Sequence, residues 1–300
     1  MADALQPLEA LSRATAAAVE RAAARVVRVS DGRRQLSGLL WAEGRIVTAE
    51  ECLAADEEVS VTLPDGRSVP AELAGRDPST DMALLTAETG PMEAPVAAAL
   101  PAAGALALAV GRGEDGPLAA FGIVASAGPG WTSAAGGRID ARIRLSFVLP
   151  HPLEGGAAID AAGGLIGLAV ADPRRRGLVI PVATVARAVA ALAAKGYVGR
   201  GYLGLALQPL RRAGGGLIAV EVSDDGPAAA AGFVVGDIVT TWDGAPLGSM
   251  RALARGLGPE TVGREVRVGV TRGGSPLELS VTVGERRPEA RAPGRGRRRG

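Results

Sequence analysis

Short apolar segments separated by glycine and proline turns fill the chain from residue 26 to residue 181, and this pattern restricts the fold more than any other feature of the sequence. Residues 59–63 and 67–73, for example, flank the turn Pro64-Asp65-Gly66, which is a strong hairpin signal. No clear helical periodicity interrupts the series. Many short strands without intervening helices are typical of a β-barrel or a β-sandwich, so we expect a mainly β fold.

Two helices are expected at the borders of this strand-rich region. Residues 8–25 have apolar side chains at three-to-four spacing, and residues 181–195 begin with proline and are followed by Gly196. The expected strands are residues 25–30, 36–41, 45–48, 59–63, 67–73, 82–85, 106–110, 120–125, 138–147 and 177–180. Residues 94–111 are uncharged and almost long enough to span a membrane. Their two prolines favour a buried strand pair with a turn instead, so no membrane span is expected.

A different order of elements begins near residues 196–200. Strands are expected at 202–207, 218–222, 237–242, 265–271 and 277–283, and helices at 227–231 and 249–257. After residue 285 the composition is restricted to Arg, Gly, Pro, Ala and Glu, which cannot form a core. We therefore predict an N-terminal helix (1–25), two folded domains (26–196 and 199–285) and a disordered tail (286–300).

The charge is distributed unevenly along the chain. The net charge is +1, but residues 286–300 hold seven arginines and one glutamate, so the rest is mildly acidic. The tail has no aromatic residue for base stacking, and we expect weak anion binding instead of a nucleic-acid partner. Cys52 is the only cysteine, which excludes an intrachain disulfide. The N-terminus has no secretory signal, which predicts a cytoplasmic protein, or a periplasmic one if a leader has been trimmed.

Six segments, in order, make the chain similar to a known family. They are residues 45–53 (RIVTAEECL), 59–67 (VSVTLPDGR), 75–85 (GRDPSTDMALL), 108–126 (with LAVG and FGIVAS), 151–168 (HPLEGGAAIDAAGGLIGL) and 199–205 (GRGYLGL). Together they resemble the HtrA/Do (Deg)-type serine proteases. The resemblance implies a chymotrypsin-like double β-barrel followed by a PDZ domain.

Transferring the catalytic triad of this family, residue by residue, shows that two of its three members are replaced. The aspartate position is retained as Asp81, whereas the histidine position holds Glu51 and the serine position holds Glu154. The family's oxyanion hole uses the backbone N–H groups of the nucleophile and of a glycine two residues earlier. That glycine position is Pro152, which has no N–H.

These replacements predict a proteolytically inactive member, or pseudoprotease. Acyl transfer needs an attacking hydroxyl, a base and oxyanion donors, and a carboxylate cannot replace the hydroxyl. The alternative is an active serine endopeptidase of protein quality control that uses other residues. Ser126 and Ser146 lie in expected strands without a base to activate them. His151, the only histidine, is expected on a loop surface, and Cys52 is expected as a small buried residue.

The family fold would bring Glu51, Asp81 and Glu154 together. Converging carboxylates raise one another's pKa or recruit a cation, so an acid-lined divalent-metal site is one hypothesis. The alternative is three solvated acids at an abandoned cleft. We favour the second and expect neither a metal nor another cofactor.

The second domain retains the features that peptide binding requires. PDZ domains add a peptide as a strand and hold its C-terminal carboxylate with backbone N–H groups. The expected binding residues are the loop residues Tyr202, Leu203, Gly204 and Leu205 and the helix residues Met250, Leu253 and Leu257. The expected partners are C-terminal or unfolded segments of proteins, and the alternative is a domain used only for oligomer contacts. The family also forms trimers through N-terminal aromatic residues, which residues 1–25 lack, so the oligomeric state stays open.

Overall fold

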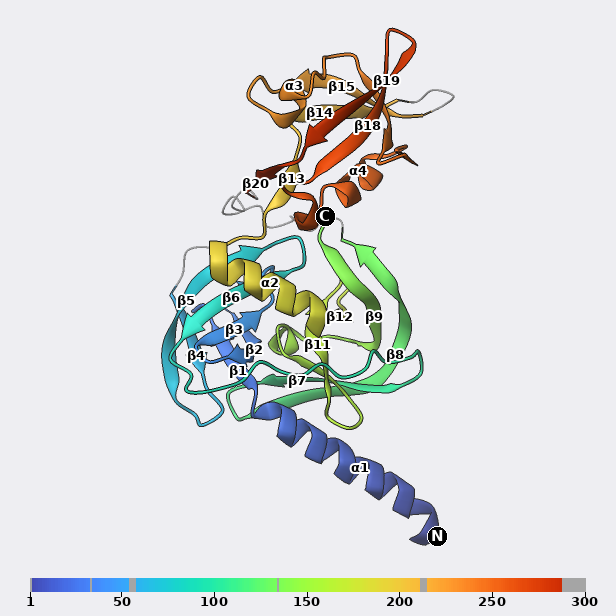
Figure 1. Cartoon of the computed structure of the whole chain (residues 1–300). Coiled ribbons are helices and arrows are strands. Elements are labelled where there is room, and N and C mark those ends of the chain that lie inside the picture. Colours follow the sequence, from blue (N-terminus) through green and yellow to red (C-terminus); the bar gives the residue numbers. More distant parts are fainter. Residues whose placement is uncertain (1, 33, 54–57, 134, 211–214, 288–300) are drawn as a thin grey trace, which may run out of the picture. The chain divides into compact units, whose positions relative to one another are not determined.

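The computed structural model describes residues 2–32, 34–53, 58–133, 135–210 and 215–287 of the 300-residue chain. It divides into two compact units, the first ending at Tyr197 and the second beginning at Val198 (Figure 1). Strands dominate both units, so the expected mainly β fold is confirmed.

Two closed six-stranded barrels form the first unit. The first barrel has the order β1-β2-β3-β6-β5-β4 and consists of β1 (Val26–Ser30), β2 (Gln35–Ala42), β3 (Arg45–Thr48), β4 (Val59–Thr62), β5 (Ser68–Asp77) and β6 (Met82–Ala87). The second has the order β10-β11-β12-β9-β8-β7 and consists of β7 (Leu106–Arg112), β8 (Pro117–Thr132), β9 (Arg138–Val148), β10 (Ala157–Asp160), β11 (Leu165–Ala171) and β12 (Arg176–Pro181). All pairings between these strands are antiparallel, and inward-facing Val, Leu, Ile and Ala side chains fill both interiors.

Helices border the barrels as the sequence predicts. Helix α2 (Val182–Lys195) follows Pro181 and ends at Gly196, whose φ of 76° is the left-handed conformation expected after a helix. It packs against strands of both barrels (Figure 1). Helix α1 (Ala2–Ala23) begins earlier than expected because Leu5 continues the apolar spacing towards the N-terminus.

The prediction of a strand pair at residues 94–111 is wrong. Only β7 forms there, and the preceding residues contribute a single bridge between Ala97 and Leu165. Prolines in this segment remove backbone donors that a ladder needs. Val96 is 89% exposed and Leu100 is 59% exposed, so this apolar composition does not mark a buried strand.

A five-strand path in one sheet forms the core of the second unit. It runs β14 (Leu205–Pro209), β15 (Leu217–Val222), β16 (Ile238–Trp242), β18 (Glu265–Arg272) and β19 (Ser275–Thr282), with β17 (Ala245–Pro246) paired to β16. A separate pair joins β13 (Arg200–Tyr202) to β20 (Gly284–Arg286), and the helical segments are α3 (Pro227–Ala230), α4 (Met250–Gly256) and η2 (Pro259–Thr261). Apolar side chains of the sheet, α3 and α4 share one core.

Two boundaries in this unit differ from the sequence prediction. The strand expected at 202–207 is broken at Gly204, whose φ of +79° is incompatible with an extended strand. Arg286, the predicted first residue of the tail, instead ends β20, and its guanidinium lies 5.9 Å from the centre of the Tyr202 ring. The remainder of the predicted tail, residues 288–300, lies outside the described residues.

None of the helices in the described part of the chain is both long enough and apolar enough to cross a membrane.

An ion pair between a buried aspartate and a partly exposed arginine links the turn before β16 to the end of β18. The side chain of Asp237 is 0% exposed, and Arg272 binds it through Nε at 2.7 Å and Nη2 at 2.8 Å. Hydrogen bonds from Arg272 lower the pKa of Asp237, burial opposes this, and the N–H of Val234 lowers it further. The pair therefore stabilises the folded unit at neutral pH.

We predict that Asp237→Asn lowers the free energy of unfolding of the second unit by about 1–3 kcal/mol at pH 7. In the wild type, the ion pair adds to the free energy of unfolding at pH values above about 4, the pKa of an aspartate in the unfolded chain. This contribution is lost as the pH falls through the lower pKa that Asp237 has in the folded unit. Hydrogen–deuterium exchange of β16 and β18 in the full chain measures this loss of stability. Asp243→Asn is the matched control, since the Arg264 of its ion pair is 57% exposed. Equal effects of the two substitutions would contradict the assignment.

Candidate functional site

The retained aspartate lies at the end of a tight turn between β5 and β6. Asp77 holds this turn by accepting hydrogen bonds from the Ser79 N–H at 3.0 Å and from the hydroxyls of Ser79 and Thr80. Asp81, with a φ of 57°, then accepts the backbone N–H of Glu51 at 2.8 Å. The structure therefore places the predicted histidine position beside the predicted aspartate position, although residue 51 has no imidazole.

The surroundings of Asp81 favour its neutral form. Burial raises the pKa of Asp81 to about 7, the hydrogen bond from Glu51 N–H opposes this, and the charges of Glu51, Glu50 and Glu154 raise it again. The predicted acids are thus close enough to interact electrostatically. One of them is held mostly protonated at mildly acidic pH.

The loop that carries the predicted nucleophile position is closed by its own hydrogen bonds. Residues His151–Leu153 form a 3-10 turn, η1, in which the N–H of Glu154 donates to the carbonyl of His151 at 3.1 Å. Pro152, in the middle of this turn, has no N–H to offer. Neither of the two family oxyanion donors is therefore available for a substrate carbonyl in this conformation.

Contacts with the first barrel fix the position of this loop. Ser37 donates its N–H to the carbonyl of Glu154 at 2.9 Å and its hydroxyl to the carbonyl of Pro152 at 2.5 Å. Gly155 has a φ of +80°, and a Cβ there would lie 2.3 Å from the carbonyl oxygen of Ser37. Only glycine fits this approach, so the glycine turn of the family is still needed for packing.

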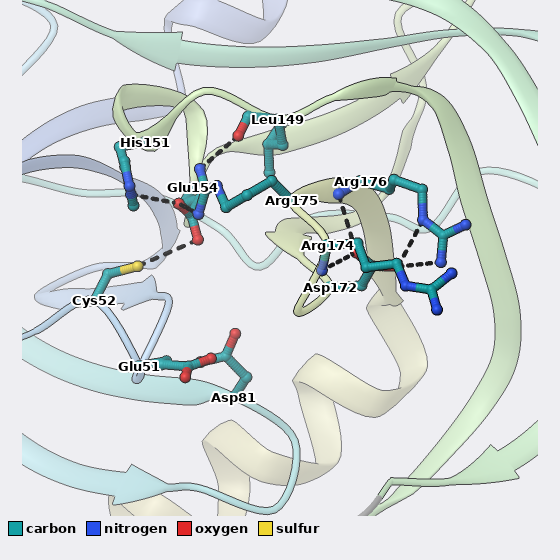
Figure 2. Close-up of polar contacts among 10 residues, drawn as sticks. All are labelled: Glu51, Cys52, Asp81, Leu149, His151, Glu154, Asp172, Arg174, Arg175 and Arg176. Carbon is teal, nitrogen blue, oxygen red and sulfur yellow. Dashed lines mark hydrogen bonds and ion pairs between the residues drawn. The ribbon is translucent and has the colours of Figure 1, made fainter. Parts of the chain in front are cut away.

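The carboxylate of Glu154 points inward and has three partners (Figure 2). The residue is only 3% exposed. Its Oε1 accepts a hydrogen bond from Arg175 and lies 2.8 Å from Nδ1 of His151. Its Oε2 lies 3.2 Å from Sγ of Cys52. A buried carboxylate without such partners would be strongly destabilising, so this network accounts for glutamate at the serine position.

Arg175 is the residue that sequence reasoning missed. It lies in the turn between β11 and β12 with a φ of 64°, and its Nη2 donates to the carbonyl of Leu149 at 2.6 Å. The N–H of Leu149 in turn donates to the carbonyl of Arg175 at 2.8 Å. The available signal was the run Arg174–Arg176 just after the nucleophile hairpin, but that run does not indicate which arginine turns inward.

Cys52 and His151 take part in the site in ways the sequence does not reveal. Cys52 is buried, as expected, and its thiol contacts Glu154. Burial and the nearby Glu154 carboxylate raise the pKa of Cys52, so the thiol is a poor nucleophile. The His151 side chain is 72% exposed, as expected for a loop residue, yet its ring nitrogen is anchored. Ser146 lies on the outer face of its barrel and accepts the N–H of Ile123 at 3.1 Å.

The expected peptide-binding residues gather in the second unit between β13, β14 and α4. Leu203 and Gly204 form the link between the two strands, and their carbonyls accept the N–H groups of Ala228 and Ser223, both at 2.8 Å. Within the described ranges, the N–H groups of Leu203 and Gly204 have no protein acceptor, although both residues are buried. Such donors suit a ligand carboxylate.

Apolar side chains lie beside these donors. Leu203 and Leu253 are buried in the core of the unit, and Leu205 and Leu257 pack against it. Met250 opens α4 and is 43% exposed. Tyr202 ends β13, and its hydroxyl donates to Oγ of Ser223 at 3.3 Å. The unit thus combines unpaired donors with an apolar lining.

Comparison with protein families identifies both units. The model of the trypsin-like peptidase domain matches residues 36–168, and the model of the PDZ domain matches residues 201–283. Serine endoprotease DegS of Escherichia coli (strain K12) is 30% identical over 303 residues, which cover 89% of this chain and 85% of DegS. A probable periplasmic serine endoprotease DegP-like of Halomonas elongata is 30% identical over 279 residues. That match covers 85% of this chain but 58% of the relative, so the chain spans little more than half of such DegP-like proteins.

Solved structures support the same assignment. HtrA-type protease AlgW with a decapeptide has a TM-score of 0.73 and 25% identity, covering 90% of this chain and 98% of that structure. The serine endoprotease from Yersinia pestis has a TM-score of 0.72 and 27% identity, covering 89% of this chain and 96% of that structure.

We predict that Asp81→Asn increases stability at alkaline pH. Because the folded pKa of Asp81, about 7, exceeds the unfolded value, the free energy of unfolding falls as the pH rises from about 4 through about 7. Asparagine keeps an acceptor for the Glu51 N–H without this dependence. Urea unfolding should show a gain over the wild type that is larger at pH 8 than at pH 5 by about 1–3 kcal/mol. Glu72→Gln, which removes an exposed carboxylate, is the control, and an equal gain at both pH values would refute the prediction.

Proposed function

The chain belongs to the HtrA/Deg family of trypsin-like serine proteases with a PDZ domain, and on this basis we propose that it binds peptide segments without cutting them. In this proposal it is a pseudoprotease, and its PDZ domain captures C-terminal or unfolded segments as an adaptor or chaperone-like module. The observation that carries the proposal is the contrast between two loops. The backbone N–H groups of the nucleophile loop from Leu153 to Gly156 all donate to carbonyls of the first unit, whereas those of Leu203 and Gly204 have no acceptor among the described residues.

Three features at the positions of the family's active site argue against acyl transfer. The serine position holds a carboxylate that is already bound to Arg175. The histidine position holds Glu51, and the N–H of Glu154 is used within the turn at Pro152. Loss of the triad costs on the order of 10⁶ in rate, and loss of an oxyanion donor costs about 10²–10³, although these factors do not multiply simply.

The case for peptide capture rests on the second unit. Strand β14 borders the sheet and lies near α4, so an extended peptide can add as a further strand between them. The C-terminal carboxylate of the peptide would accept hydrogen bonds from the N–H groups of Leu203 and Gly204. The last side chain of the peptide would contact Leu253 and Leu257. The solved AlgW structure contains a decapeptide, which agrees with this class of ligand.

The alternative remains an active serine endopeptidase of protein quality control, since the relatives are named as proteases. We also propose a periplasmic location, because the DegP-like relatives are named as periplasmic. A homo-oligomer is compatible with both functions.

We predict that a peptide of about ten residues with an apolar C-terminus binds the full chain, and that amidation of its carboxylate weakens binding at least about tenfold. Gly204→Ala should cause a similar loss, because a Cβ there would lie 3.0 Å from Cα of Gly226 and its φ is +79°. Fluorescence anisotropy measures both.

Gly244→Ala is the matched control, with a similar φ of +77° but no atom within 4 Å of the added Cβ. Equal affinity for the amidated and free peptides would refute carboxylate capture.

We predict no turnover of unfolded casein by the full chain, and none by Glu154→Ser, because a hydroxyl alone restores neither the base nor the Pro152 donor. Release of labelled fragments measures cleavage, with an active DegS-type protease as the positive control. Turnover of the wild-type chain that is abolished by a serine-directed inhibitor would refute the pseudoprotease and establish the alternative.

A further inference from the structure

The only cysteine and the only histidine of the chain meet at one carboxylate. Cys52 follows β3 and His151 opens η1, 99 positions later in the sequence, yet both side chains contact Glu154. We propose that Cys52, His151 and Glu154 form a binding site for a zinc ion. This inference concerns the first unit alone and does not depend on peptide binding by the second.

The donor atoms already lie close to a coordination geometry. Sγ of Cys52, a ring nitrogen of His151 and a carboxylate oxygen of Glu154 all lie within 4.8 Å of one another. Zinc bonds of about 2.0–2.3 Å place tetrahedral ligand atoms about 3.3–3.8 Å apart. The contacts of Glu154 with His151 and Cys52, at 2.8 Å and 3.2 Å, must therefore lengthen slightly, while any longer separation in the cluster shortens by about 1 Å. His151 and Glu154 are three positions apart on a 3-10 turn, which puts them on the same face.

The polar contacts at the site are the ones that an ion would replace. Nδ1 of His151 lies 2.8 Å from Oε1 of Glu154, and the Cys52 thiol donates a hydrogen bond to Oε2 (Figure 2). When a divalent ion binds, the thiol proton leaves to solvent and the imidazole adopts its neutral Nε2–H tautomer. The ion then occupies the space between three acceptors, and one proton is released per ion bound.

Arg175 does not block the site. A carboxylate has about four lone-pair positions, and the Arg175 guanidinium occupies one of those on Oε1. Arg175 is also tied to the carbonyl of Leu149, so it can stay in place and orient the ligand from behind. Its positive charge lowers the affinity for a cation, while the carboxylate of Glu51, next to Cys52 in the sequence, acts in the opposite sense.

The identity of the donors selects the ion. A thiolate, an imidazole and one carboxylate favour zinc or cobalt over magnesium or calcium, which prefer all-oxygen sites. Three protein ligands leave a fourth position for water, because His151 is exposed on one side. Bound zinc would join the segment after β3 to the nucleophile loop, and so connect the two barrels.

Isothermal titration of the untagged, reduced full chain with Zn²⁺ tests the proposal. We expect one ion per chain with a dissociation constant in the micromolar range or tighter, and no displacement by millimolar Mg²⁺. Titration with Co²⁺ should produce the near-ultraviolet charge-transfer band of a cobalt–thiolate bond. Zinc should also raise the melting temperature.

Two substitutions must each weaken zinc binding by about tenfold or more. Cys52→Ala should also abolish the cobalt–thiolate band. His151→Ala changes an exposed side chain, so it keeps the test decisive if Cys52→Ala fails to fold. Glu72→Gln, on the surface of the first barrel, should leave the affinity unchanged.

The outcomes separate this site from the acid-lined alternative. If Glu51→Gln weakens binding and His151→Ala does not, the ligands are Glu51, Asp81 and Glu154, and the proposal is overturned. Absence of zinc binding, or binding unchanged in both Cys52→Ala and His151→Ala, overturns it as well. None of these results alters the expected capture of peptides, which is measured separately.

Discussion

The ion pair between Glu154 and Arg175 determines how the former nucleophile loop is built. A carboxylate that is almost fully buried must be compensated, and Arg175 supplies the charge while also binding the carbonyl of Leu149. One side chain therefore fixes both ends of the loop. A serine at this position would need no such partner, so the arginine turn between β11 and β12 and the glutamate depend on each other.

The same constraint explains why the oxyanion donors are absent. The Glu154 side chain turns inward, and the loop closes as a 3-10 turn in which the backbone N–H of Glu154 donates to the carbonyl of His151. Pro152 fits such a turn because its missing N–H leaves no buried donor to satisfy. The glycines that remain serve packing, as the close approach of Gly155 to Ser37 requires. The loop is thus a consistent structural element in which the glutamate, the proline and the glycines each have a structural role.

Most of the fold could be predicted from the sequence because each strand carries its own local signal. Segments such as Arg45–Thr48 alternate or are continuously apolar between turn residues, and the prediction places them correctly. The prediction failed at residues 94–105, whose apolar composition suggested a buried strand. Their prolines lack the backbone N–H groups that a ladder of strand pairing needs. The site was harder, since the contacts among Cys52, His151, Glu154 and Arg175 join segments far apart in the chain. Substitution at the triad positions was visible, but the compensating partner was not.

The two binding surfaces of the chain differ in how their backbone donors are used. Hydrogen-bond donors that are buried without an acceptor are costly, so a fold keeps them only where water or a ligand satisfies them. In the described part of the nucleophile loop, the N–H groups from Leu153 to Gly156 all have acceptors, which lie within the loop itself and on Ala169 of β11. The link at Leu203 and Gly204 keeps two N–H groups without an acceptor among the described residues, beside apolar side chains and at the edge of a sheet. By this criterion the second unit, as far as the structure describes it, has the unpaired donors and apolar lining that the proposed capture of peptides requires. The first unit holds the cluster of side chains that is proposed to bind an ion.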